Sequence, residues 1–354
     1  MRNMKYRAAA ALLAVSVAAA GLTGCGVGSK LDKNAVVATV GEEKINLGVA
    51  NFYARYQQVQ VESSYAQMLG MAGEDLWAQE LTEGETYEDT IKDGVLKGLE
   101  QMYILKSHMA DYSVEITEEE QAKIDKAAFE FVDKNNLEAK EMTTADEKVV
   151  GEMLTLLTIQ KKMTDAMTAD VSTEVSDEEA AQKKMQYVSF SYSKTAEDGS
   201  SATMTEEEKA AVKASAQAFA DGAGAAEDFA AYATEQGYEA TDKTFDAEDT
   251  SPSTEMIAAV NALSEGQTSG VIESENGCYV AKLVSALDRE ATDAEKQSII
   301  NQRKNDRFTE IYEGWQKAAK VEVDEKVWEK VDFVSQGVTM KEAEEESADN
   351  KTEK

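Results

Sequence analysis

The chain has 354 residues, of which 42% are hydrophobic, and carries 36 basic against 68 acidic residues, a formal net charge of −32. This size and hydrophobic content predict more than one folded domain and exclude a disordered chain, while the acidic excess makes nucleic acid a poor partner. One histidine, His108, and two cysteines, Cys25 and Cys278, leave no CxxC metal or redox site and argue against histidine-based hydrolase chemistry. We expect no cofactor and no metal ion.

The N-terminal segment has the features of a bacterial export signal. Three basic residues within the first seven precede a mainly apolar run, residues 8–20, and small residues precede Cys25. The motif Leu22-Thr23-Gly24-Cys25 resembles the lipobox of bacterial lipoproteins, in which the cysteine becomes the lipidated first residue. The resemblance implies a signal peptide over residues 1–24 and lipid on Cys25. An ordinary cleavage site followed by a free or disulfide-bonded cysteine is the alternative.

Lipid on Cys25 would place the protein at a bacterial cell membrane, on the extracytoplasmic face. Removing residues 1–24 removes three positive charges and no acidic residue, which leaves 33 basic against 68 acidic residues. No later segment approaches the ~20 uninterrupted apolar residues that a membrane helix needs. We therefore expect the lipid on Cys25 to be the only membrane attachment.

After the signal, the chain predicts a tether, a hairpin and a series of helices. Residues 25–34 are polar and contain glycine, as a tether does. Alternating residues over 35–45, with a turn at Gly41, predict a hairpin. Apolar residues at three- and four-residue spacing over 46–170 predict helices, with His108 at a helix surface or boundary. Capping boxes, which satisfy free backbone N–H groups at a helix start, are predicted at five pairs: Thr117 with Glu120, Thr144 with Glu147, Ser176 with Glu179, Thr205 with Glu208, and Thr292 with Glu295.

A change of period predicts a second domain. Tyr187–Tyr192 alternates as a half-buried strand does. Three helices and two strands follow, with Asn276-Gly277 as the hairpin signal between the strands and Cys278 as a half-buried strand residue. The expected ranges are 193–201 for a loop, 205–220, 225–236 and 251–263 for the helices (Pro252 in the first helical position), 271–272 and 279–284 for the strands, 292–320 for a long helix, 321–323 for a short strand, and 341–354 for a disordered charged tail.

This arrangement resembles the PrsA/SurA-type foldase lipoproteins, whose parvulin-like peptidyl-prolyl isomerase domain is inserted between two segments of a helical chaperone lobe. The motifs that carry the resemblance are Val36–Gly41, Ile116–Glu120, Ala259–Ser269 and Gly277–Lys282. The resemblance implies an α+β fold, in which N- and C-terminal segments form a mainly helical, SurA-N-like lobe around an inserted parvulin-like α/β domain. The implied boundaries are 1–24 for the signal peptide, 25–34 for the lipidated tether, 35–175 for the N-terminal lobe, 180–288 for the parvulin-like domain, 290–335 for the returning C-terminal helix, and 341–354 for the tail.

The resemblance also implies where a prolyl peptide would bind. Parvulins typically hold one histidine on the first strand and another on the last, in contact beneath the bound peptide, and the corresponding positions here are Tyr187 and Tyr279. Their hydroxyls could replace paired imidazoles, so these two residues are the candidate catalytic pair, with ordinary strand aromatics as the alternative. Met256 and Ser189 are the candidate peptide-binding residues, and a core position is the alternative for Met256. The glycine-rich segment of the family is not recognisable between Gly237 and Thr250.

We therefore expect a membrane-anchored, extracytoplasmic folding factor whose partners are unfolded or partly folded exported polypeptides. Several of the 14 methionines fall in the helical segment, where flexible side chains suit varied clients. Isomerase activity is left open because the usual histidines are missing, and the oligomeric state is left open, a dimer included. Two alternatives remain: a non-catalytic partner-binding lipoprotein on an inactivated parvulin fold, and a solute-binding lipoprotein of a transporter, which would show repeated strand–helix units.

Overall fold

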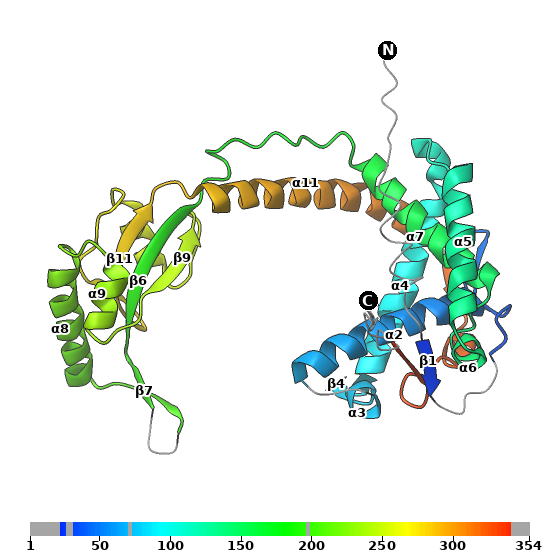
Figure 1. Ribbon diagram of the computed structural model, residues 1–354, viewed down its shortest axis with the longest axis horizontal. Coiled ribbons are helices and arrows are strands. Elements are labelled where there is room, and N and C mark those ends of the chain that lie inside the picture. The colour runs from blue at the N-terminus through cyan, green and yellow to red at the C-terminus, as the bar shows by residue number, and fades with distance from the viewer. Residues whose placement is uncertain (1–21, 26–30, 70–72, 196–198, 341–354) are drawn as a thin grey trace, which may run out of the picture. The chain divides into compact units, whose positions relative to one another are not determined.

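The computed structural model describes residues 22–25, 31–69, 73–195 and 199–340 (Figure 1). The chain divides into two compact units. One contains the described residues up to Asp170 and from Arg307 onwards, and the other spans Val171–Asp306. The N- and C-terminal segments thus form one mainly helical unit and the middle of the chain forms an α/β unit, which confirms the predicted fold class. Most of the predicted signal peptide, residues 1–21, and the predicted tail, 341–354, lie outside the described residues.

A three-stranded antiparallel sheet joins the two segments of the first unit. Strands β2 (Val36–Val40) and β3 (Glu43–Asn46) form the predicted hairpin, and Gly41 between them has a φ of 59°, a conformation that favours glycine. Strand β12 (Val321–Val323) pairs antiparallel with β2, which gives the sheet order β12-β2-β3. The short C-terminal strand predicted at this position is therefore confirmed.

Helices make up most of the first unit and share one apolar core. Helix α2 packs against α4 and α7, and α5 packs against α7. The hairpin of β4 and β5 interrupts the region that was predicted to be helical throughout. The elements are α2 (Leu47–Leu69), α3 (Glu74–Trp77), β4 (Glu80–Thr82), β5 (Glu85–Thr86), α4 (Tyr87–Ser107), the 3-10 helix η1 (Met109–Tyr112), α5 (Glu118–Lys134), α6 (Leu137–Met142), α7 (Glu147–Met167) and α12 (Glu325–Trp328).

The last described strand, β13 (Gly337–Met340), pairs antiparallel with β1 (Leu22–Cys25), and Cys25 lies opposite Gly337. Figure 1 labels β1 in the helical unit, beside α6. The sequence predicts that residues 22–24 belong to a signal peptide outside the fold and that Cys25 begins a tether. In the uncut chain all four residues form a strand that pairs with the backbone N–H and C=O groups of β13, and the predicted signal peptide and tether stay predictions.

The second unit is built on a four-stranded antiparallel sheet in the order β10-β11-β6-β9. Helices α8 and α9 cover one face, and α10 packs beside β10 and β11. Helix α11 belongs to both units, since the unit boundary falls at Arg307. The elements are β6 (Lys183–Ser191), β7 (Ser193–Thr195), β8 (Ser201–Thr203), α8 (Glu206–Ala223), α9 (Phe229–Glu235), β9 (Thr241–Phe245), α10 (Thr254–Asn261), β10 (Ile272–Ser274), β11 (Gly277–Ser285) and α11 (Arg289–Ala318).

Several details of the second unit differ from the sequence prediction. Strand β9 was not predicted, and the predicted loop over 193–201 contains the β7–β8 hairpin. Helix α10 begins at Thr254, with the Ser253 side chain accepting the capping hydrogen bond, so Pro252 is not in its first position. Cys278 is fully buried, because its strand is covered by α8, whereas the sequence predicts a half-buried residue.

The predicted capping boxes have mixed outcomes. Those at Thr117 and Thr205 are confirmed at the starts of α5 and α8. The box at Thr144 is wrong, because Asp146 caps α7 and the Thr144 hydroxyl is buried and donates to a backbone oxygen of α2. The box at Thr292 is wrong as well, since that residue lies inside α11. The Ser176 side chain accepts a hydrogen bond from the Glu179 backbone, but within a turn and not at a helix start.

Candidate functional site

The sheet of the second unit has two apolar faces, because successive side chains of a strand point to opposite sides. On one face, Val188, Phe190 and Val280 pack with α8 and α9. On the other, Met185 and Leu283 pack with α10 and β10. Strands β6 and β11 supply both faces, so the position of each side chain along these two strands decides which core it joins.

The structure brings the two predicted catalytic tyrosines together on the α10 face. Tyr187 of β6 and Tyr279 of β11 lie with ring centroids 6.0 Å apart and planes at 71°, an edge-to-face contact. The strand register pairs Tyr187 with Ala281 and Tyr279 with Ser189, so the two tyrosines are diagonal neighbours. Tyr279 is 8% exposed, whereas Tyr187 is half-buried.

The two predicted peptide-binding residues occupy different environments. Ser189 is exposed on β6, directly opposite Tyr279 in the register. Met256 is fully buried on α10, in the same apolar cluster as Tyr279. Only Ser189 and part of Tyr187 are therefore open to a ligand in this structure. The role of all four residues in binding a peptide stays a prediction.

The α10 face combines apolar side chains with the hydroxyls of two tyrosines and one serine. These hydroxyls can donate and accept hydrogen bonds, and none of them is a metal ligand of the usual kind. Within the part of the chain that the structure describes, no three His, Cys, Asp or Glu side chains come together as a metal ion would require. Ligand binding by this face would therefore rest on apolar contacts and on hydrogen bonds with these hydroxyls.

The opposite face holds the second cysteine in a dry environment. The Tyr192 hydroxyl and the Cys278 Sγ lie 2.9 Å apart in a hydrogen bond, with the thiol fully buried. This hydrogen bond, followed by burial, raises the pKa of Tyr192 to about 12. The Tyr192 hydroxyl therefore stays neutral at physiological pH, and both residues pack in the core of this face.

The single histidine lies at a helix boundary, as predicted. His108 is the C-cap of α4, and its Nδ1 lies 2.7 Å from Oδ2 of Asp111. Its ring stacks on Trp315 with centroids 4.0 Å apart and planes at 5°. Sequence reasoning missed this stacking partner, because Trp315 comes more than 200 residues later and faces the core side of α11.

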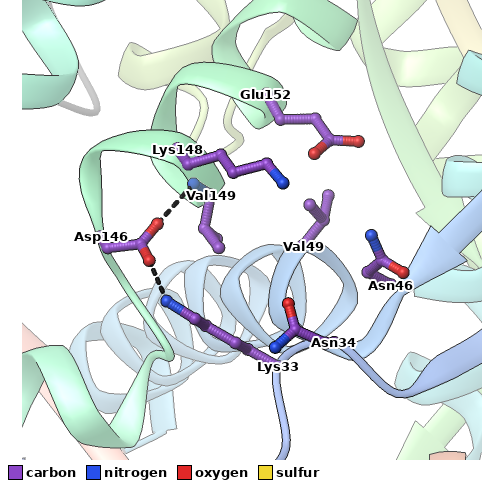
Figure 2. Close-up of a pocket in the computed structure, with 8 residues that line it drawn as sticks. All are labelled: Lys33, Asn34, Asn46, Val49, Asp146, Lys148, Val149 and Glu152. Carbon is purple, nitrogen blue, oxygen red and sulfur yellow. Dashed lines mark hydrogen bonds and ion pairs between the residues drawn. The ribbon is translucent and has the colours of Figure 1, made fainter.

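A pocket at the start of α7 is lined by residues of the first unit (Figure 2). Asp146 receives the α7 capping hydrogen bond from the Val149 backbone at 2.8 Å and pairs with Lys33. Burial alone would raise the pKa of Asp146, but these two hydrogen bonds outweigh it and lower the pKa. Glu152 accepts a hydrogen bond from the Tyr103 hydroxyl at 2.8 Å. Neighbouring side chains thus satisfy both carboxylates, and the pocket indicates no ligand.

The antiparallel β10-β11-β6-β9 sheet with its flanking helices belongs to a parvulin-type domain. Residues 192–296 match the family model described as "PPIC-type PPIASE domain", which confirms this part of the predicted resemblance. The matched range contains Tyr279 and Met256 and begins just after Tyr187 and Ser189. No curated protein matches the chain.

The solved structures to which the chain is similar include one of SurA-like chaperones and two of PrsA. A structure of the SurA-like chaperones PEB4 and Cj1289 of Campylobacter jejuni is 11% identical, with 82% of this chain and 99% of that chain covered and a TM-score of 0.29. The foldase protein PrsA of Streptococcus pneumoniae is 15% identical, with 72% and 98% covered and a TM-score of 0.29. The peptidylprolyl isomerase PrsA of Bacillus cereus is 19% identical, with 72% and 97% covered and a TM-score of 0.30.

None of the described helices is both long enough and apolar enough to cross a membrane.

Proposed function

We infer that this protein is a membrane-anchored, extracytoplasmic folding factor that binds unfolded or partly folded exported polypeptides. The observation that carries this proposal is a PPIC-type domain, matched over residues 192–296, inserted between the two segments of a helical unit. The lipobox-like motif Leu22–Cys25 supports an anchor through lipid on Cys25. The formal charge of the chain, −32, keeps a protein with client-binding apolar surface soluble.

We further propose that the parvulin-type domain catalyses prolyl isomerisation. The reaction breaks no covalent bond, and its barrier of about 20 kcal/mol falls when a site binds the twisted amide more tightly than the planar one. The tyrosine pair lies against an apolar cluster, where hydrogen bonds from hydroxyls are stronger than in water. Tyr187 and Tyr279 would donate these bonds to the prolyl peptide, with Ser189 at the open side.

A non-catalytic, partner-binding role is the second candidate, and the packing of the tyrosine face favours it. Tyr279 is 8% exposed and Met256 is fully buried, so a proline ring could reach this face only beside Tyr187 and Ser189 or by displacing α10. The solute-binding alternative has no comparable support, since the described sheets are antiparallel and lack the repeated strand–helix units of such proteins.

The deciding experiment measures isomerase activity on a panel of X-Pro peptides with the chain that starts after Cys25. The variants Tyr187→Phe and Tyr279→Phe remove only the hydroxyls, and Tyr238→Phe, on the opposite face of the same sheet, is the matched control. An isomerase that uses the tyrosine pair loses activity in the first two variants and keeps it in the control. No activity above the uncatalysed rate would move the domain to the partner-binding class.

Two further measurements address the chaperone and membrane parts of the proposal. Suppression of aggregation of a denatured exported protein tests client binding independently of isomerisation. Membrane fractionation and mass spectrometry of the full chain, beside Cys25→Ala, test the anchor. A chain that stays uncleaved and unlipidated at Cys25 in its own cell envelope would refute the anchor while leaving the folding role open.

A further inference from the structure

Strand β13 is held in place by contacts that do not involve β1. Arg55 of α2 donates a hydrogen bond to the backbone oxygen of Gln336 at 2.8 Å, and Gln58 donates to the same oxygen at 3.1 Å. Gln336 directly precedes β13, and Val338 inside the strand is fully buried. Hydrogen bonds to α2 therefore fix the residue that precedes β13 without β1, and α2 and α6 also pack against β13 itself.

Strand β1 occupies this edge through its backbone. Its four residues pair antiparallel with Gly337–Met340, and in such a ladder alternate residues exchange N–H and C=O groups with the partner strand. Helix α6 contacts β1 as well as β13, so the occupant lies against a helix along the edge. The occupying sequence, Leu-Thr-Gly-Cys, is uncharged and consists of small and apolar residues.

The same four residues form the proposed processing site, so this inference rests on the proposed function. Cleavage before Cys25 would remove Leu22, Thr23 and Gly24, and three of the four β1 positions would be lost. The edge of β13 would then carry unpaired N–H and C=O groups. An unpaired strand edge binds extended polypeptides by strand addition, in which main-chain hydrogen bonds give affinity without a fixed sequence.

We propose that the edge of β13 is a client-binding site of the helical unit, separate from the parvulin-type domain. Its ligand is an extended, uncharged segment of small and apolar residues in an unfolded exported polypeptide, which adds as a strand in place of β1. Before processing, the chain's own lipobox closes the site. Client capture at this edge therefore begins only after the signal is removed.

Hydrogen exchange of the backbone amides of Gly337–Met340 tests the proposal. The full chain with Cys25→Ser is compared with the chain that begins at residue 25 and carries the same substitution, each made directly so that no cellular processing is needed.

The probe is an acetylated peptide of residues 20–27 with Cys25→Ser. The control peptide also carries Thr23→Pro, which removes a backbone N–H and the freedom to pair. Circular dichroism checks that the shortened chain is folded, and Gly24→Pro in the full chain opens the edge without truncation.

The β13 amides should exchange slowly in the full chain, severalfold faster in the shortened chain and in Gly24→Pro, and slowly again when the probe peptide is added. The control peptide should restore no protection. Equal exchange in the full and shortened chains, or no effect of the probe peptide, overturns the proposal. Protection in the shortened chain that rises with its own concentration overturns it too, since a second copy would then be the occupant. Because neither chain needs lipidation, these outcomes are independent of whether Cys25 is processed in cells.

Discussion

Arg55 and Gln336 are separated by 281 residues along the chain and are joined by a hydrogen bond of 2.8 Å from the guanidinium to the Gln336 backbone oxygen. The same guanidinium donates to the Asp332 backbone oxygen at 3.0 Å and to the Gln336 side chain at 3.0 Å. Arg55 is fully buried, and burial lowers its pKa to about 10 although nearby carboxylates act in the opposite direction. It therefore stays charged at neutral pH and fastens the C-terminal segment to α2.

Replacing Arg55 with methionine should strongly destabilise the first unit. Methionine has a similar length but cannot donate to the part-buried Asp332 backbone oxygen or the Gln336 side-chain oxygen, and it leaves the Gln336 backbone oxygen with Gln58 as its donor. The loss of these hydrogen bonds should cost about 3 kcal/mol of unfolding free energy. Urea denaturation of the two chains measures the difference. Lys317→Met is the control, because Lys317 pairs only with Glu313 on the exposed side of α11 and should cost well under 1 kcal/mol. Equal effects of the two substitutions would show that the buried hydrogen bonds contribute nothing specific.

The hydrogen bonds between Arg55 and the C-terminal segment could not be predicted from the sequence. Two of the hydrogen-bond partners of Arg55 are the backbone oxygens of Asp332 and Gln336, and a backbone group leaves no trace in the pattern of side chains along the sequence. Strand β9 was missed for a related reason: Thr241–Phe245 is mostly polar, because it lies at a sheet edge. The apolar alternation of β6 predicted that central strand correctly, since both of its faces are packed.

The family resemblance identified Tyr187 and Tyr279 as a candidate pair, but the contact between their rings could not be predicted from the sequence. Contact between Tyr187 and Tyr279 depends on a register that sets Tyr187 opposite Ala281, and a shift of one residue would turn one ring to the other face. The burial of Met256 depends on how α10 packs on the sheet. The residue types alone could therefore identify the candidate residues, but they could not show whether each one lines a peptide-binding groove or lies in the core.

Met256→Ala separates those two roles. Met256 is fully buried in the apolar cluster formed by β6, β11 and α10. Its truncation to alanine should lower the unfolding free energy by about 2–5 kcal/mol, because a cavity remains. Thermal or urea unfolding of the second unit measures the loss. Ser189→Ala, an exposed residue on the same face, should change stability little. A loss below about 1 kcal/mol for Met256→Ala would instead support a position in an open groove.

Glu208 should make the second unit sensitive to acid. A hydrogen bond from Lys194, followed by one from the Thr205 backbone, lowers the pKa of Glu208 to about 2 from its usual value of 4.5. Because the folded pKa lies below the unfolded one, the stabilising contribution is complete above about pH 4.5 and is lost as the pH falls towards 2. Unfolding free energies of the native chain and Glu208→Gln should differ at pH 7 and converge near pH 2.

The control for this prediction is Glu207→Gln, an exposed carboxylate in the same first turn of α8. It removes the same charge without removing the capping box. A pH-dependent difference of the same size in both variants would assign the effect to the general charge of the turn and would contradict the role of the Lys194–Glu208–Thr205 contacts.

Asp177 should hold the segment before β6 against α11 within the second unit. Its two carboxylate oxygens accept hydrogen bonds from Arg289 at 2.9 and 2.7 Å, and Lys296 pairs with the same group. The Arg289 hydrogen bond is the main cause of a strongly lowered pKa of Asp177. The substitution Asp177→Asn should therefore speed cleavage by a Glu-specific protease after Glu174, Glu178 and Glu179, and high salt should speed cleavage of the native chain in the same way, because exposed ion pairs are screened. Asp293→Asn, which removes another carboxylate near Arg289, is the control, and cleavage that responds equally to both substitutions would show that Asp177 is not the residue that holds the segment.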